Sequence, residues 1–264
     1  MTGRAITSLA NPAVKAARAL HQRKAREQSG LFLAEGLKVV TEAVDVGRAP
    51  RILLYGVEAA DHPLLRGAAA VAGEVVVVTP AILAKISRRD NPQTVLGIFE
   101  QVFTPLAELD SAAGPCWVAL EAVRDPGNLG TIIRTADAAG CAAVILVGDC
   151  CDPHSVEAVR ATMGSIFAVR IARATAAEFL AWRARWPGAV VGASLATTID
   201  FRQADYRSPA LLIMGNEQAG LTPALAAACD TLVKIPMRGR ADSLNLAVAT
   251  GIMIYTAIGV ESRR

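Results

Sequence analysis

Aromatic residues are scarce in this chain of 264 residues, because phenylalanine, tryptophan and tyrosine together make up only 5 % of it. Proteins that hold single-stranded nucleic acid by stacking many bases need a series of such rings, so the composition argues against a binder of that type. The excess of basic over acidic residues is also small, with a formal net charge of +3. A mildly basic chain permits a nucleic-acid partner but does not require one.

Cysteine-based sites are missing as well. The five cysteines form no CxxC pair and no Cys/His spacing typical of zinc. An odd number that includes the adjacent Cys150 and Cys151 is a poor basis for a disulfide framework, which favours reduced thiols in a cytosolic protein. The N-terminus has no apolar signal core, and no hydrophobic run reaches the length of a membrane span. We therefore expect a soluble, cytoplasmic protein without a membrane partner.

Hydrophobic residues are plentiful at 53 % of the chain, which is enough for a full core. In the first half, strand-like and helix-like segments alternate, which predicts a small α/β domain. Residues 103–115 then contain proline, serine and glycine with little periodicity. We place the domain boundary there, with one domain over 1–105 and a second over 106–264. The first domain is predicted to have strands at 31–36, 51–56, 74–79 and 94–102, helices at 37–47 and 80–87, and a weaker helix between 56 and 74.

Residues 11–28 are predicted to form one amphipathic helix. A weak apolar stripe of valine, alanine and leucine runs along it, and basic side chains crowd the rest. Two interpretations stay open, a solvated helix face or a surface that follows RNA phosphates. The candidate RNA contacts on this helix are Arg23, Lys24 and Arg26.

The second half repeats the alternation with clearer signals. Its candidate strands are short and mostly apolar throughout, which is typical of a parallel sheet covered on both faces. Helical patterns lie between most of them. The strands are expected at 116–123, 143–148, 167–172, 189–194, 210–215 and 231–236.

Three polar, glycine-containing clusters follow strands of this half: DPGNLGTIIR (125–134), GNEQAGLT (215–222) and PMRGRADSLN (236–245). Ligands in open α/β sheets bind outside the carboxyl ends of the strands, so these loops are the expected site. A dinucleotide-binding Rossmann fold is disfavoured because GxGxxG is absent. Asp149, which follows a strand as a ribose-binding acid would, is then better explained as a turn residue.

Individual residues in these clusters raise separate questions. Arg134 lies between Ile133 and Thr135 in the first turns of an apolar helix, where a charge so close to a buried stripe needs a partner or a function. Ser243 is predicted to cap the final helix, with Asn245 in its first turn. Gly215 and Gly220 bracket Glu217 in a turn that needs positive φ or close backbone approach.

Taken together, the three clusters resemble the motif set of the SpoU/TrmH family, AdoMet-dependent RNA ribose 2′-O-methyltransferases of the SPOUT superfamily. The resemblance covers about residues 115 to 260. The stretches ITSLANPAVKAARAL and FLAEGLKVVTEA resemble, less specifically, the substrate-binding domain that many members carry in front. The matching motif residues are Asn128, Arg134, Gly215, Asn216, Glu217 and Gly220, together with the stretch from Ile235 to Ile252.

The resemblance implies an α/β fold with a small N-terminal L30e-like domain, followed by a methyltransferase domain whose C-terminal part forms a deep trefoil knot, a rare topology. It also implies a homodimer with active sites near the subunit interface. It implies S-adenosyl-L-methionine (AdoMet) as the cofactor and no metal. Cofactor contacts carried over by position are Gly215, Ile235, Met237, Ser243 and Leu244, where apolar side chains and exposed backbone suit a flat adenine.

The same resemblance implies a catalytic set of Arg134, Asn128, Glu217, Ser243 and Asn245. Because a guanidinium has a pKa of about 12 or more, Arg134 is better suited to orient a phosphate and stabilise developing alkoxide charge than to act as a base. Asn128 would support Arg134 or the ribose, while Glu217 and Asn245 would shape the pocket. Arg160 is a further candidate RNA contact, and His154 is expected in a turn.

Three functions remain in competition. The first is methylation of a ribose 2′-hydroxyl in structured RNA, with 23S rRNA favoured over tRNA by the front domain. The second is an RNA-binding or ribosome-assembly protein without catalysis, against which the intact motif residues argue. The third is a dinucleotide-dependent enzyme, which the missing glycine motif disfavours.

Overall fold

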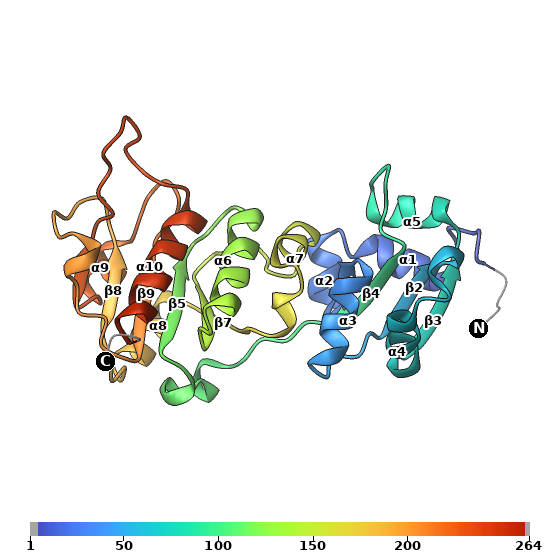
Figure 1. Cartoon of the computed structure of the whole chain (residues 1–264), viewed down its shortest axis with the longest axis horizontal. Coiled ribbons are helices and arrows are strands. Elements are labelled where there is room, and N and C mark those ends of the chain that lie inside the picture. Colours follow the sequence, from blue (N-terminus) through green and yellow to red (C-terminus); the bar gives the residue numbers. More distant parts are fainter. Residues whose placement is uncertain (1–4, 262–264) are drawn as a thin grey trace. The chain divides into compact units, whose positions relative to one another are not determined.

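The protein divides into two compact units in a computed structural model that describes residues 5–261. The first unit comprises residues 1–101 and 152–168, and the second comprises 102–151 and 169–264. Figure 1 labels most of the helices and strands of both units. The predicted division at residue 105 therefore has a counterpart near residue 101, but residues 152–168 leave the second unit and fold with the first.

The first unit is built on a four-stranded mixed sheet with the order β1-β4-β2-β3. Strand β4 runs antiparallel to both neighbours, whereas β2 and β3 are parallel. All four strands lie within the ranges expected from the sequence. They are β1 (Leu31–Glu35), β2 (Ile52–Gly56), β3 (Glu74–Val78) and β4 (Val95–Glu100).

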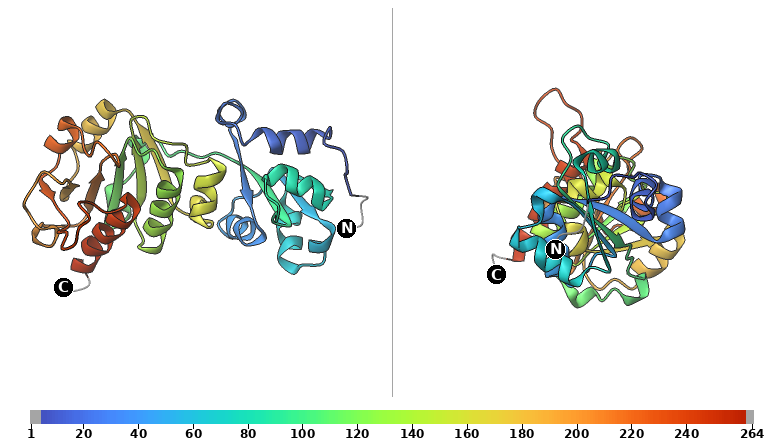
Figure 2. Two further views of the ribbon diagram at one scale, coloured as in Figure 1. Left: turned by 90° about the horizontal axis from the view of Figure 1, so that it is seen from above. Right: turned by 90° about the vertical axis from the view of Figure 1, so that its right-hand side faces the viewer.

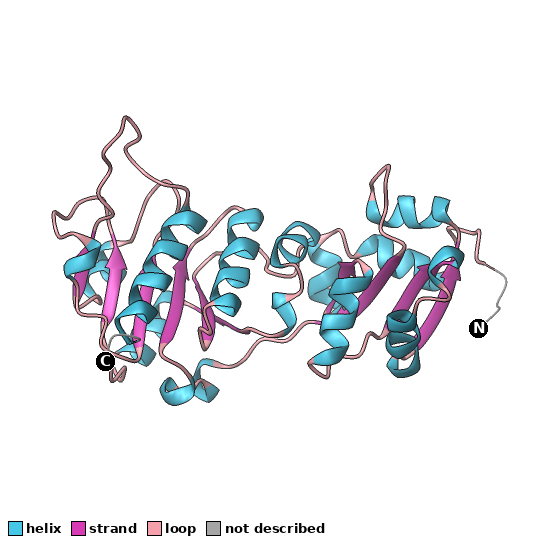
Figure 3. Cartoon of the chain, in the orientation of Figure 1, coloured by secondary structure: helices cyan, strands magenta, loops and turns pink. Residues whose placement is uncertain are grey.

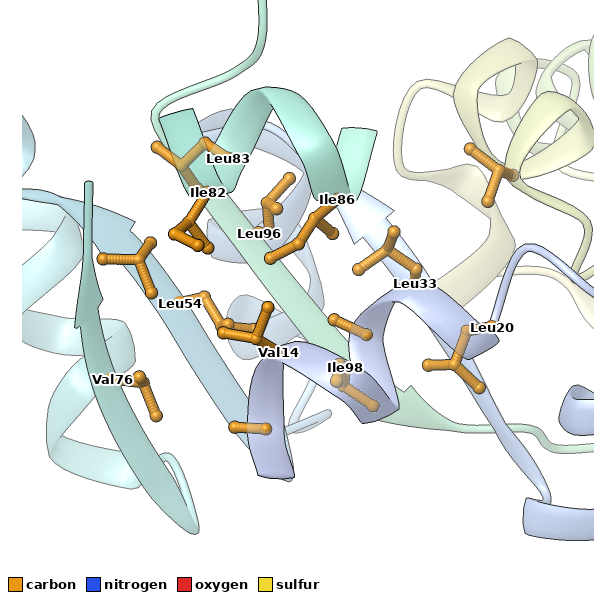
Figure 4. Close-up of a cluster of buried hydrophobic side chains, with 14 residues drawn as sticks. Val14, Leu20, Leu33, Leu54, Val76, Ile82, Leu83, Ile86, Leu96 and Ile98 are labelled. Atoms are coloured by element: carbon orange, nitrogen blue, oxygen red, sulfur yellow. The ribbon is translucent and has the colours of Figure 1, made fainter. Parts of the chain in front are cut away.

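Helices cover both faces of this sheet, as Figure 3 shows in cyan around the magenta strands. One face packs against α1 (Pro12–Ala19) and α5 (Pro80–Ser87) through a buried apolar cluster, drawn in Figure 4. The other face packs against α3 (Leu37–Asp45), which contacts α4 (Pro63–Val71). The remaining helices of this unit are α2 (Arg23–Ser29) and α7 (Val156–Thr162).

The predicted single helix over 11–28 is wrong in one respect, because the chain forms two helices separated at residues 20–22. Asn11 caps α1, its Oδ1 accepting a hydrogen bond from the Ala13 N–H at 2.9 Å, and Pro12 follows at the first helical position. Leu20 is buried in the same core as α1, and the chain turns there before α2 begins. Periodicity alone does not reveal a short turn between two helices of similar composition.

The second unit is built on a six-stranded, fully parallel sheet with the order β10-β8-β9-β5-β6-β7. The predicted parallel sheet of this half is therefore confirmed. Its third strand begins later than expected because residues 165–167 form a 3-10 turn. The strands are β5 (Cys116–Glu121), β6 (Ala143–Val147), β7 (Arg170–Ala174), β8 (Val190–Ala193), β9 (Ala210–Met214) and β10 (Thr231–Val233).

Helices also cover both faces of the second sheet. On one face, α6 (Pro126–Ala138) and α10 (Leu246–Glu261) lie side by side, which the left view of Figure 2 shows in green and red. The other face packs against α8 (Ala176–Arg183) and α9 (Pro223–Ala227) around the buried Trp117. None of the helices within residues 5–261 has the length and hydrophobicity needed to cross a membrane.

Candidate functional site

The candidate site lies in the loops that follow β5 and β9, which are neighbouring parallel strands. From β5 the chain crosses to β6 on one side, and from β9 it continues to β10 at the opposite edge. Loops that diverge in this way leave a crevice at the carboxyl ends of the strands. The first two polar clusters of the sequence meet there, as expected, and the third joins them through α10.

The turn from β5 into α6 is fixed by local features of the sequence. Asp125 caps α6, with its Oδ1 accepting a hydrogen bond from the Asn128 N–H at 2.6 Å, and Pro126 occupies the first helical position. Ala122 has a φ of +49°, a left-handed conformation that is uncommon for a residue with a Cβ. The turn therefore holds a strained residue directly before the site.

The turn after β9 requires its glycines. A Cβ on Gly215 would lie 2.2 Å from the carbonyl carbon of Gly220, and Gly220 itself has a φ of +69°. The Asn216 side chain closes the turn, because its Oδ1 accepts hydrogen bonds from two backbone N–H groups at 2.9 and 3.0 Å. Its Nδ2 donates to the Ala122 carbonyl at 2.7 Å, which joins the two turns.

Glu217 is the acceptor at the centre of the cluster. The backbone N–H groups of Arg124 and Asp125 donate to its carboxylate at 3.2 Å each, and the Asn128 Nδ2 donates at 3.3 Å. Partial burial would raise the pKa of Glu217, but these hydrogen bonds outweigh it and lower the pKa below its ordinary value. The side chain is therefore an anion that holds the β5–α6 turn.

Asn245 connects the third cluster to the first. Its Nδ2 donates to the Asn128 Oδ1 at 2.8 Å, and its own Oδ1 accepts from the Ala247 and Val248 N–H groups at 2.9 and 3.3 Å. The prediction that Ser243 caps the final helix is wrong, because Asn245 is the cap and α10 begins at Leu246. The exposed Ser243 instead donates to the Asp242 carboxylate at 3.3 Å.

Arg134 lies on α6 with its side chain exposed, although Ile132 and Ile133 beside it are buried. Within residues 5–261 the structure gives it neither a hydrogen bond nor an ion pair. A guanidinium on the solvent side of a helix keeps all its donors available to an outside anion. No partner among the described residues accounts for this charge, as expected of a side chain that binds an outside anion.

Except for Gly215 in the turn after β9, the predicted cofactor contacts lie in the connection to α10. From Ile235 to Leu244 the chain forms neither helix nor strand, so no ladder consumes its backbone donors and acceptors. Ile235 and Met237 are half-buried, and Leu244 is 38 % exposed. Apolar side chains beside free backbone groups suit a flat purine with polar edges, so the residues present fit AdoMet.

Sequence reasoning missed an ion pair beside this cluster. Arg124 donates to the Asp149 carboxylate at 2.7 Å, with both side chains largely exposed. The two residues follow the adjacent parallel strands β5 and β6, so their opposite charges after predicted strands were the available signal. The expectation that Asp149 is a turn residue does not include this pairing.

The predicted RNA contacts divide into two pairs. Arg23 and Lys24 are exposed on α2, where Arg23 pairs with Glu27. Arg26, however, is 4 % exposed and donates to the Asp152 carboxylate at 2.7 Å. A side chain buried in this way does not reach an RNA phosphate, so its assignment as an RNA contact is corrected.

The Arg160 side chain is also paired within the first unit. Its guanidinium binds both carboxylate oxygens of Glu35, at 2.7 to 2.9 Å, and donates to the Ser87 carbonyl at 3.1 Å. This bidentate pairing uses the geometry that would otherwise grip a phosphate. His154 lies in a turn, as expected, but it is buried there at 3 % exposed, and its ring lies 4.7 Å from that of Phe32.

Two family models match the chain. The model of the SpoU rRNA Methylase family matches residues 115–255, and that of an MRM3-like substrate binding domain matches residues 11–97. The first range holds all three polar clusters of the candidate site. The second covers most of the four-stranded sheet of the first unit.

Individual relatives are similar along nearly the whole chain. The 23S rRNA (uridine(2479)-2'-O)-methyltransferase of Streptomyces viridochromogenes is 32 % identical over 250 residues, which cover 90 % of this chain and 86 % of that protein. The 23S rRNA (guanosine(2553)-2'-O)-methyltransferase RlmP of Bacillus subtilis is 30 % identical over 251 residues, or 95 % and 97 %. The AdoMet-bound rRNA methyltransferase from Sinorhizobium meliloti superposes with a TM-score of 0.89 at 50 % identity, covering 96 % of this chain and 97 % of that one.

Proposed function

Because the chain belongs to the SpoU rRNA methylase family, we propose that it transfers a methyl group from AdoMet to a ribose 2′-hydroxyl of RNA, with 23S rRNA as the substrate. The observation that carries this proposal is the cluster in which the Asn128 side chain donates to Glu217 and accepts from Asn245. It links three motifs that are far apart in the sequence. The relatives are named as 23S rRNA 2′-O-methyltransferases, and they act on different nucleotides, so the target class transfers more readily than the target position.

The chemistry needs a carbon electrophile, an oxygen nucleophile and a path for one proton. AdoMet, when bound, supplies a methyl group that is attached to a positively charged sulfur. The rest of the cofactor leaves as a neutral thioether. We assign its binding to the turn at Gly215 and to the chain at Ile235, Met237, Ser243 and Leu244. Holding the ribose oxygen in line with the methyl carbon then accounts for much of the rate.

Arg134 is proposed to act on the RNA side of the reaction. Its guanidinium, which has no partner among the residues that the structure describes, would bind the phosphate next to the target ribose and stabilise the negative charge that develops on the 2′-oxygen. Because a guanidinium stays protonated, the hydroxyl proton passes to the RNA phosphate or to water. The new C–O bond forms as the C–S bond breaks, so no oxidant or metal enters the balance.

Glu217 is assigned as a positioning residue and not as the base. Its carboxylate already accepts hydrogen bonds from the β5–α6 turn, and these lower its pKa. An anion that is stabilised in this way is a weak proton acceptor. Its function in this proposal is to fix the turn that carries Asn128 into α6.

The arrangement of the C-terminal segment supports a trefoil knot. Strand β10 lies at the edge of the sheet, yet α10, which follows it, packs against β5, β9 and α6 near the centre. Residues 234–245 therefore return across the carboxyl ends of the strands. We propose that this return passes through a preceding loop, as the family resemblance implies, and that the first unit is the L30e-like substrate-binding domain.

A homodimer is proposed through the outer face of α10. Val248 and Tyr255 are 52 % and 54 % exposed, and the half-buried Ile252 lies between them at helical spacing. We expect that Val248→Glu combined with Tyr255→Glu yields monomers, because two charges would be buried in the interface. Light scattering checks the mass, and a wild-type protein that is itself monomeric at micromolar concentration would contradict the assignment.

The experiment that tests the function uses AdoMet labelled in its methyl group. We would incubate the protein with unmodified 23S rRNA, 16S rRNA and bulk tRNA, and map the label after nuclease digestion. A labelled, nuclease-resistant dinucleotide in 23S rRNA, absent with Arg134→Ala, is the expected result. Label in tRNA alone would show that the substrate is tRNA and not 23S rRNA. AdoMet binding without methyl transfer to RNA or to ribosomal particles would indicate a binding protein without catalytic activity.

A further inference from the structure

The formal charge of the chain is unevenly divided between the two units. Of the 27 lysines and arginines, 14 lie in residues 1–101 and 152–168, and of the 24 aspartates and glutamates, 11 do. The first unit therefore carries the whole net charge of +3. The second unit, with 13 of each sign, is formally neutral.

Within the first unit, acidic residues are absent from two stretches of sequence. No aspartate or glutamate precedes Glu27, and none lies between Glu74 and Asp90. The first stretch contains α1 and the start of α2, and the second contains α5. Helices α1 and α5 contain no acidic residue at all, and the one acid of α2, Glu27, forms its ion pair with Arg23.

The fold brings these two stretches together on one face of the sheet. Val14 and Leu20 from the first stretch and Ile82 and Ile86 of α5 enter the same buried cluster, which Figure 4 shows above the strands. The His21 Nε2 lies 2.6 Å from the Ile86 carbonyl oxygen, which ties the corner between α1 and α2 to the end of α5. Apolar sides turned inward leave the basic sides of both helices outward.

We call this exposed basic layer the α1–α5 surface. Among residues 5–261 the structure gives its side chains no ion-pair partner. Arg88 ends α5 with a φ of +56°, so the chain turns there and continues to Arg89 at the surface. The α1–α5 surface consists of Lys15, Arg18, Lys24, Lys85, Arg88 and Arg89, all exposed.

The opposite layer of the same unit is different in character. On α3, Lys38 pairs with Glu42 at 3.6 Å, and on α4, Arg66 lies 3.9 Å from Asp61. Basic charge is therefore matched by acid on that side. The asymmetry gives the unit one face that attracts polyanions and one that does not.

We propose that the α1–α5 surface binds the phosphodiester backbone of the RNA substrate. This inference rests on the proposed function and specifies which face of the first unit meets the RNA. Of the contacts expected from the sequence, Lys24 belongs to this surface, whereas Arg26 and Arg160 are paired inside the first unit and residues of α1 and α5 take their place. Lysine and arginine contacts to phosphates fix the position of the protein on a nucleic acid without reading its sequence.

The test compares two triple variants of the full chain that remove the same charge. One combines Lys15→Gln, Lys85→Gln and Arg89→Gln, and spares Arg88 because of its backbone conformation. The control combines Lys38→Gln, Arg51→Gln and Arg66→Gln, whose side chains are exposed and paired with acids. Affinity for the shortest 23S rRNA transcript that the wild-type protein methylates would be measured over a series of KCl concentrations, with AdoMet binding and thermal midpoint as checks on folding.

Each lost phosphate contact lowers the slope of log affinity against log salt by about 0.7 to 0.9. We expect the first variant to lose about 2 from this slope and at least about tenfold in affinity at low salt, whereas the control changes little. Equal losses of affinity and slope in both variants would show that only the net charge matters, which would overturn the inference. RNA affinity and slope that are unchanged in the first variant would overturn it as well. A wild-type protein that binds AdoMet but no RNA would instead overturn the proposed function.

Discussion

Glu217 and Arg134 are both charged, but they relate to the protein in opposite ways. Glu217 accepts hydrogen bonds from two backbone N–H groups and from Asn128, so its charge is satisfied inside the molecule. Arg134 extends from α6 with its donors free within the described chain. A fixed anion and an available cation point to separate functions, one in holding the site and one in holding the substrate.

Replacement of Arg134 should therefore affect catalysis without affecting the fold. We expect Arg134→Ala to reduce kcat by about 10²- to 10³-fold, the range found when a donor to a developing oxyanion is removed. Arg134→Lys keeps the charge but loses the planar fork, so it should also be poor. Single-turnover methylation measures the rate, and a variant with near-normal kcat would exclude the assigned role.

Glu217→Gln tests the second role. The amide keeps one acceptor oxygen but turns an NH₂ toward donors that it cannot satisfy, a cost of about 1.5 to 3 kcal/mol for a hydrogen bond to a charged group. We expect kcat/KM to fall about 10- to 100-fold, with AdoMet affinity altered less. Because the pKa of Glu217 is lowered, the wild-type carboxylate stays ionised above its ordinary pKa, and its contribution is lost only as the pH falls through the lowered value.

Helix α10 shows how one residue serves both an element and the site. Asn245 caps this helix with its side-chain oxygen, while its nitrogen binds Asn128 on α6. The amide oxygen of Asn245 therefore stabilises the start of α10, and its amide nitrogen joins α10 to α6. A serine or aspartate cap would satisfy α10 equally well but would not make the second contact.

The two halves of this amide can be separated by mutation. Asn245→Asp keeps the cap acceptor and removes the donor to Asn128, so the thermal midpoint should stay near that of the wild type while activity falls. Asn245→Ala removes both and should cost a further ~1 kcal/mol in unfolding free energy. Thermal denaturation and methylation rates on the same preparations check the pair, and equal stability loss in both variants would refute the division.

At the scale of the whole molecule, the chain crosses between the two units at three points, near residues 101, 151 and 168. Residues 152–168 are held in the first unit by the buried ion pair of Asp152 with Arg26 and by that of Glu35 with Arg160. Burial would raise the pKa of Asp152, but hydrogen bonds from the His154 N–H and from Arg26 lower it below its ordinary value. The first unit is therefore completed by a segment that follows β6 in the sequence.

This arrangement predicts how the first unit responds to mutation and to acid. Arg26→Ala leaves a buried carboxylate without its cation and should cost about 3 to 5 kcal/mol, whereas Arg26→Met with Asp152→Asn removes both charges and should cost much less. Since the pKa of Asp152 is lowered, its stabilising effect is complete above the ordinary value near 3.8 and disappears as the pH falls through the folded value. Denaturant titrations between pH 7 and pH 3 measure both effects, and similar losses in the single and double variants would argue against the pair.

Sequence alone determined the strands, the parallel second sheet and the three polar clusters, because period, length and glycine placement are local properties. The motif resemblance also identified Asn128, Glu217 and Asn245 as members of one site. The sequence did not reveal the break at residues 20–22, the cap at Asn245 or the place of residues 152–168 in the first unit. The break and the place of residues 152–168 depend on contacts between residues distant in the chain, and Asn245 combines its local cap with a distant contact to Asn128.

The arginines show most clearly what only the tertiary structure decided. Arg26, Arg134 and Arg160 are indistinguishable by composition, and each was a candidate contact for RNA. Folding places a carboxylate 2.7 Å from Arg26 and another 2.7 Å from Arg160, but leaves Arg134 exposed. Whether a charge is available to a ligand depends on the partner that the fold brings to it, and a local sequence pattern does not contain that partner.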